Sequence, residues 1–193
     1  MSSHPILEAA ADGTLPPWAA VGPTRTGHLE RVAALLDSWA QGLGLDDRER
    51  RRWRSAGFLH DALREADPEK LRERVPPDLA ALPRPVLHGP AAAERLRIEG
   101  VGDGELLHAV AFHTIGAPAL GRLGRALYSA DFLEPGRSFL PDWRASLRGR
   151  MPQDLDSVCR EVAGARIRNL LERGSSLPSQ TVGFWNTLAQ ENA

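Results

Sequence analysis

Apolar residues recur at intervals of three and four along nearly the whole chain, and this spacing limits the fold more than any other feature. An α-helix turns once every ~3.6 residues, so this spacing places the apolar side chains on one face. Strands would instead show alternating, β-branched runs between turn signals, and such runs are missing from the sequence. The sequence therefore predicts an all-α protein.

The same spacing predicts where the helices lie. The first two strong helices are expected over residues 24–41 and 46–65, and the proline-rich segment 75–85 is expected to be an irregular connection. Pro90 marks the start of another helix, because a proline at the first helical position lacks only an N–H that has no partner there. Later helices are expected over residues 103–115, 118–133 and 152–173, and a short one after SSLPSQ.

The composition is that of an ordinary globular domain. With 193 residues, of which 42% are hydrophobic and 25% charged, the chain is long enough for one sizeable core. We expect a flexible N-terminal tail over residues 1–17 and a single domain over residues 18–193, which ends in the C-terminal helices.

Charge, cysteine content and hydropathy exclude several classes of protein. The formal charge of -1 provides no general basic field for nucleic acid or an anionic membrane. The single Cys159 excludes an internal disulfide framework and a cysteine-rich zinc module. No apolar stretch approaches the roughly 20 residues of a membrane span, and the first residues do not resemble a signal peptide. We therefore expect a cytoplasmic enzyme or binding domain with no nucleic-acid or membrane partner.

The segment GFLHDALRE, residues 57–65, places two polar side chains directly after an apolar run. His60 and Asp61 point about 100° apart on a helix, so both reach one site only if that site lies between their directions, as a metal centre does. Asp131 is a second anomaly, because it follows leucines at helical spacing where a core residue is expected. A buried carboxylate is costly unless it is paired or bound to a metal.

Further histidines extend this pattern. His28 lies on the apolar stripe of the first helix, His113 lies on an apolar face, and His88 lies just before a helix start. Each of these alone is more simply explained as a hydrogen-bonded core histidine, but their joint occurrence with the His-Asp pair favours a metal centre. His4 in the tail does not belong to the pattern, and His108 faces away from His113 on the same helix and is assigned to the surface or to a supporting position.

Five segments occur in the order found in HD-superfamily metal-dependent phosphohydrolases: RTGHLERV, GFLHDALRE, VLHGPAAAERL, AFHTIGAP and ALYSADFLEPGR. The chain resembles in particular the YqeK-like symmetrical bis(5'-nucleosyl)-tetraphosphatases over about residues 22–137, with a weaker likeness in LPSQTVGFWN. This resemblance implies an all-α HD-domain helical bundle with a buried di-metal site, usually of iron, that hydrolyses diadenosine tetraphosphate to two ADP.

The resemblance also implies roles for the polar residues. His60 and Asp61 are the implied catalytic residues, and Asp61 bridges two metal ions. The implied ligands are His28, His60, Asp61 and Asp131 for one metal, and His88, His113 and the shared Asp61 for the other. Imidazole and carboxylate without thiolate suit iron or manganese and leave zinc open. Two metal ions lower the pKa of a bridging water, so a metal-bridging hydroxide is the expected nucleophile.

Residues next to these motifs are the candidates for binding substrate phosphates. Arg64 and Arg137 flank ligand segments. For Arg25 and Arg125, a solvated helix face is as good an explanation as a phosphate contact. A glycine lets the chain approach a ligand closely, so the HTIG segment is expected to shape a phosphate loop. The full set of substrate-binding candidates is Arg25, Arg64, Thr114, Gly116, Arg125 and Arg137.

Two positions depart from the pattern of the family. Ala117 stands where the family usually carries an arginine, and Pro178 stands where it usually carries a histidine. Three alternatives therefore stay open, namely an HD-type nucleotidase of smaller nucleotides, a di-iron oxygenase relative, and a nucleotide-binding regulatory module. The expected partner is a small nucleotide substrate, and a homodimer is also left open.

Overall fold

The computed structural model describes residues 4–191, and every regular element within this range is a helix. This confirms the predicted all-α class. None of the described helices is long and apolar enough to cross a membrane. The α-helices are α1 (Pro5–Ala11), α2 (Pro23–Gly42), α3 (Asp47–Leu59), α4 (Pro68–Arg72), α5 (His88–Ile98), α6 (Gly104–Phe112), α7 (Arg122–Leu133), α8 (Pro141–Arg150), α9 (Leu155–Glu172) and α10 (Ser179–Gln190).

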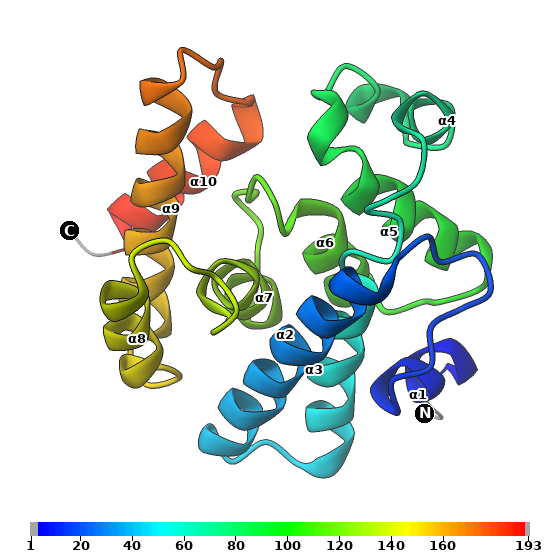
Figure 1. The fold of residues 1–193 in the computed structure, drawn as a ribbon, viewed down its shortest axis with the longest axis horizontal. Helices are drawn as coiled ribbons and strands as arrows, with labels where there is room; N and C mark the ends of the chain where they lie inside the picture. The colour runs from blue at the N-terminus through cyan, green and yellow to red at the C-terminus, as the bar shows by residue number, and fades with distance from the viewer. Residues whose placement is uncertain (1–3, 192–193) are drawn as a thin grey trace.

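Helix α7 lies in the middle of the molecule, with α2, α3 and α6 on one side and α8 and α9 on the other (Figure 1). Because neighbours surround it, almost every residue from Leu123 to Leu133 is buried. A polar residue on this helix therefore enters the interior. Asp131 occupies such a position.

Helices α2 and α3 pack closely because a small residue of each faces the other. A Cβ atom on Gly57 would lie 2.6 Å from the Cα of Ala33, so the two backbones nearly touch at this point. Just before α2, the N–H of Ala20 donates to the carbonyl of Ala62 at 2.7 Å. These contacts place the start of α2, which carries His28, beside the segment that follows α3.

Several boundaries differ from those predicted. Helix α3 ends at Leu59 and the chain continues in turns, because Ala62 and Glu65 make backbone hydrogen bonds to Ala20 instead of continuing the helix. Helix α7 begins at Arg122, later than predicted, and α1, α4 and α8 were not predicted. The proline-rich connection contains two short 3-10 helices, η1 (Pro77–Leu79) and η2 (Arg84–Val86).

The N-terminal segment, for which the sequence predicts a flexible tail, contains a helix that packs against the rest of the domain. Helix α1 packs against α3 and buries Leu7 and Ala10. Arg51 on α3 binds Asp12, with the guanidinium 2.9 Å from the carboxylate. The flexible tail over residues 1–17 stays a prediction, which now has to accommodate this packed helix, and residues 1–3 of it lie outside the described residues.

Candidate metal centre

Four imidazoles and two carboxylates converge between α2, α3, α5, α6 and α7. They come from the start of α2, the end of α3, the first residue of α5, the end of α6 and the inner face of α7. All of them are at most 8% exposed. We call this set the His/Asp cluster; it consists of His28, His60, Asp61, His88, His113 and Asp131.

Two groups of three residues within the cluster have the spacing of metal ligands. One group is His28, His60 and Asp131, and the other is His60, Asp61 and His113; in each, one ligand atom per residue lies within 4.8 Å of the others. In the first group, the Nε2 of His28 lies 3.2 Å from the Oδ1 of Asp131. His60 belongs to both groups.

Asp61 faces the two halves of the cluster with different oxygens. Its Oδ2 lies 3.7 Å from the Nε2 atoms of both His28 and His60. Its Oδ1 lies 2.9 Å from the Nε2 of His88 and 3.3 Å from that of His113. A carboxylate in this position can contact two metal ions at once.

Backbone carbonyls fix the tautomers of two histidines. The Nδ1 of His60 lies 2.7 Å from the carbonyl oxygen of Gly57, and the Nδ1 of His113 lies 2.8 Å from that of Val110. Because a carbonyl only accepts, each Nδ1 carries the proton and each Nε2 keeps its lone pair. Burial lowers the pKa of His60 to about 3, so this ring stays neutral at pH 7.

His28 is oriented in the same way by a carboxylate, because its Nδ1 lies 3.2 Å from Glu134. Its Nε2 lies 3.3 Å from the Nε2 of His60, and with these tautomers neither nitrogen has a proton to donate. Lone pairs facing each other beside carboxylates repel unless a cation lies between them. A histidine that donates its outer N–H to a carbonyl or carboxylate is typical of metal ligation, so this donor set fits a metal ion.

His88 is bonded differently. Its Nδ1 lies 3.2 Å from the Nη1 of Arg64, which only donates, so the proton lies on Nε2 and goes to Asp61. Binding a metal through this Nε2 requires the other tautomer, and Arg64 must then leave the Nδ1 atom. His88 must therefore change its tautomer and its hydrogen bond before it can bind a metal ion, whereas the other three histidines need no such change.

Three arginines balance the carboxylates of the cluster. Arg25 lies 2.8 Å from Asp61, and Arg137 and Arg166 each lie 2.8 Å from a different oxygen of Asp131. Burial by itself raises the pKa of Asp131, but the neighbouring Arg166 guanidinium lowers it well below its usual value. The carboxylate is therefore ionised at neutral pH and available to a cation.

The HD domain family matches residues 25–158, a segment that contains the whole His/Asp cluster. The chain belongs to this family. Two curated relatives carry the name symmetrical bis(5'-nucleosyl)-tetraphosphatase. The protein from Staphylococcus aureus is 26% identical over 170 residues, which are 84% of this chain and 85% of the relative. The protein from Halalkalibacterium halodurans is 27% identical over 142 residues, or 70% of this chain and 75% of the relative.

A solved structure gives the same result for the fold. It is the crystal structure of a protein from Clostridium acetobutylicum described as a predicted HD superfamily hydrolase involved in NAD metabolism. The two chains superpose with a TM-score of 0.76 at 26% identity, over 89% of this chain and 92% of the other. Together with the relatives, this makes the chain a metal-dependent phosphohydrolase of the HD type.

Two charged residues that contact the His/Asp cluster were not predicted from the sequence. Glu134 orients His28, and Arg166 holds Asp131. Arg166 continues the buried spacing of Val158 on α9, so its charge interrupts an apolar face as Asp131 does. The sequence therefore carries a local signal for Arg166, of the same kind as that for Asp131.

The predicted arginines divide into two sets. Arg125 lies elsewhere, in ion pairs with Asp156 at 2.7 Å and Glu191 at 2.6 Å. The other three contact residues of the His/Asp cluster: Arg25, Arg64 and Arg137.

Thr114 and Gly116 of the HTIG segment have different environments. The Thr114 hydroxyl lies 3.0 Å from the Nε2 of His113. Gly116 has a φ of 73°, and a Cβ there would overlap the ring of Phe184 on α10. The glycine thus serves the packing of α10, and only the threonine contacts the cluster.

A cleft of about 1000 Å³ opens beside the cluster, with walls that include α8 and α9. Its lining includes Thr114 and Arg166, which contact the cluster directly, and the aromatic residues Phe132, Trp143 and Trp185. A molecule in this cleft would therefore lie against two residues that contact the proposed metal ligands, although none of the ligands themselves lines the cleft.

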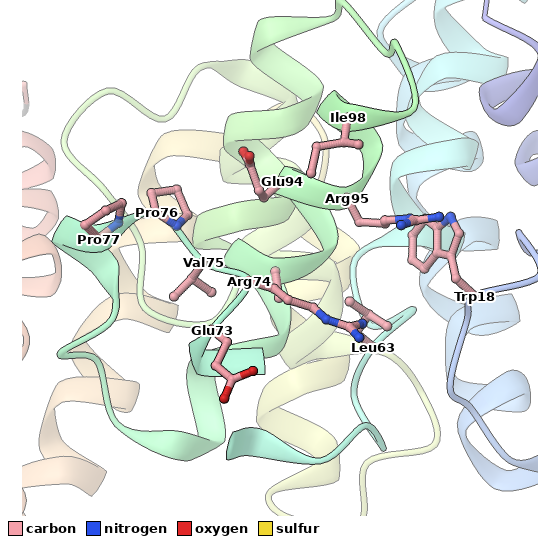
Figure 2. A pocket seen from close by; sticks show the side chains of 11 residues that line it. Trp18, Leu63, Glu73, Arg74, Val75, Pro76, Pro77, Glu94, Arg95 and Ile98 are labelled. Atoms are coloured by element: carbon pink, nitrogen blue, oxygen red, sulfur yellow. The ribbon is translucent and has the colours of Figure 1, made fainter. Parts of the chain in front are cut away.

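A second pocket, of about 580 Å³, is lined by residues before α2, after α4 and on α5 (Figure 2). Acidic and basic side chains both line it, among them Glu73, Arg74, Glu94 and Arg95. No residue of the His/Asp cluster lines it. Of the two, the larger cleft is the one lined by Thr114 and Arg166, which contact the cluster directly.

Proposed function

We propose that this HD-domain hydrolase cleaves diadenosine tetraphosphate symmetrically to two ADP. The observation that carries the proposal is a buried cluster of lone pairs and carboxylates beside a cleft of about 1000 Å³ lined by aromatic and basic side chains. The names of the curated relatives support the substrate, since they describe hydrolases of dinucleoside tetraphosphates.

The proposal includes the metal ligands. The cluster offers nitrogen and oxygen donors and no thiolate, and such ligands suit iron or manganese. We assign iron as the first candidate. When bound, the metal ions supply an activated water and electrostatic stabilisation of the oxygens at phosphorus. The assigned ligands are His28, His60, Asp61 and Asp131 for one ion, and His88, His113 and the shared Asp61 for the second.

Residues of the chain itself orient the substrate. Hydrolysis breaks the central P–O–P bridge, adds the oxygen of one water to one ADP and releases the other ADP. Arg137 has a side chain that is 40% exposed while its guanidinium contacts Asp131, so it can bind a phosphate next to the cluster. The aromatic side chains of the cleft provide surfaces for a nucleoside. The number of phosphates between this surface and the cluster then sets the position of the cut.

Hydrolysis of diadenosine tetraphosphate in water enriched with heavy oxygen tests the cut. We expect two ADP per substrate, with the label in one of them, when the products are separated by chromatography and weighed by mass spectrometry. Predominant ATP and AMP would contradict the symmetrical cut. Fast phosphate release from mononucleotides without cleavage of the dinucleotide would favour a nucleotidase, and a requirement for dioxygen would favour an oxygenase.

Arg137→Gln is expected to lower kcat/KM by about 10- to 150-fold, the range for a lost hydrogen bond to a charged group. Metal content should stay unchanged, because Arg166 still holds Asp131. Arg125→Gln is the matched control, since it removes the same charge from a site that does not touch the cluster. Equal kcat/KM for both variants and the wild type would remove Arg137 from the substrate site.

A further inference from the structure

Arg144 on α8 is a buried cation without a counter-charge. The residue is 6% exposed, and no carboxylate of residues 4–191 forms an ion pair with it. Its Nε donates to the carbonyl of Phe139 at 2.6 Å, but its Nη1 is buried and has no hydrogen-bond partner in the described chain. Such a group costs stability unless something neutralises it.

Arg166 on α9 also has a buried N–H donor without a hydrogen-bond partner in the described chain. Its Nη2 lies 2.8 Å from Asp131, and its Nη1 donates to the carbonyl of Thr114 at 3.2 Å. Its Nε, however, is buried and lacks a partner within residues 4–191. The carboxylate it contacts also pairs with Arg137, so Asp131 faces two guanidinium groups.

The two arginines lie against the same aromatic ring. The guanidinium carbons of Arg144 and Arg166 lie 3.9 and 5.3 Å from the centroid of Phe132. Both side chains line the large cleft. Burial, together with the positive charges of Arg137 and Arg166, lowers the pKa of Arg144. Two guanidinium groups therefore lie together in this part of the cleft, and among residues 4–191 Asp131 is the one carboxylate within ion-pair distance of either of them.

We infer that Arg144 and Arg166 form an anion-binding site that takes phosphate groups of the nucleotide in the cleft. The identity of the ligand as a nucleoside polyphosphate rests on the proposed function. A phosphate offers several charged acceptors, and arginine is well suited to bind it because its donors lie in one plane. Arg166 also contacts Asp131, so the site adjoins the cluster and receives the phosphates that the metal ions do not hold.

Titration of the full-length, metal-loaded protein with ADP tests this site. Arg144→Met removes the charge and keeps the length of the side chain, and we expect the affinity for ADP to fall by about 10-fold or more. Metal content should stay the same, and the thermal midpoint should stay or rise, because an unpaired buried charge is gone. Arg168→Met is the matched control, since it removes an exposed arginine from the same cleft. We expect this variant to lose about twofold or less in ADP affinity.

Arg144→Lys separates charge from packing. This variant keeps the positive charge, so ADP affinity should recover in part if the arginine binds phosphate. A lower thermal midpoint in Arg144→Met, with ADP affinity equal to that of the wild type, would make Arg144 a structural residue and overturn the inference. No measurable ADP binding by the wild-type protein would overturn it as well.

The two proposals fail differently. If the wild type produces two ADP from diadenosine tetraphosphate while Arg144→Met binds ADP normally, the anion site is wrong and the function stands. If the wild type leaves the dinucleotide intact while ADP binding still depends on Arg144, the site stands and the assigned substrate is wrong.

Discussion

Asp61→Asn is expected to bind little metal and to lose roughly 10³-fold or more in nucleotide turnover. The two oxygens of Asp61 face different halves of the cluster, so removing its charge weakens both proposed metal positions. Metal ions supply several kcal/mol of transition-state stabilisation in phosphoryl hydrolysis, and each ~1.4 kcal/mol is a factor of ten in rate. Elemental analysis and initial-rate assays on the purified variant measure both effects.

His88→Ala is the comparison for this result. His88 contacts only one oxygen of Asp61, and its ring is bonded to Arg64 in the tautomer that does not bind metal. We expect this variant to lose the second ion and keep the first. Full metal occupancy in Asp61→Asn would rule out the shared ligand.

Gly57→Ala is expected to lower the free energy of unfolding by about 1–2 kcal/mol, although alanine favours helices. A Cβ atom would lie 2.6 Å from the Ala33 Cα, so α2 and α3 must move apart. Overpacking of this kind costs about 1–3 kcal/mol, sometimes more, and the gain in helix propensity is at most about 1 kcal/mol. Metal affinity should fall too, because the Gly57 carbonyl orients His60.

Gly149→Ala is the control for this change. Gly149 lies on α8, and nothing lies within 4 Å of the Cβ that an alanine would add. We expect this variant to be neutral or more stable by up to about 1 kcal/mol. Denaturant titrations of both variants give the comparison, and wild-type stability in Gly57→Ala would show that the two helices separate at no cost.

Most residues of the cluster were predictable because they interrupt a local apolar pattern, whereas His88 was chosen for its place at a helix start. Asp131 occupies an apolar position on its helix, and a carboxylate at such a position can be recognised from the sequence alone. The end of α3 had no such signal, because the pattern continues to Glu65 while the chain turns at His60 to pair with Ala20. Helix α8 was missed since Arg144 and Leu147 alone are buried on it, which leaves too short an apolar stripe to detect.

Ion-pair partners were the least predictable part of the site. Arg25 and Arg125 were equal candidates from the sequence, yet Arg25 contacts Asp61 and Arg125 contacts Glu191. Each partner lies far along the chain, 36 and 66 residues away. No local pattern carries information over that separation, so the fold alone distinguishes the two arginines.

The cluster draws its side chains from helices that are distant in sequence, and this has a consequence for how the protein opens. A metal ion held by His28, His60 and Asp131 would act as a cross-link between α2, α3 and α7. Opening of any one of these helices would then require release of the ion, so the apparent stability would rise with the logarithm of free metal concentration. Metal supply would thereby control the lifetime of the folded chain as well as its catalysis.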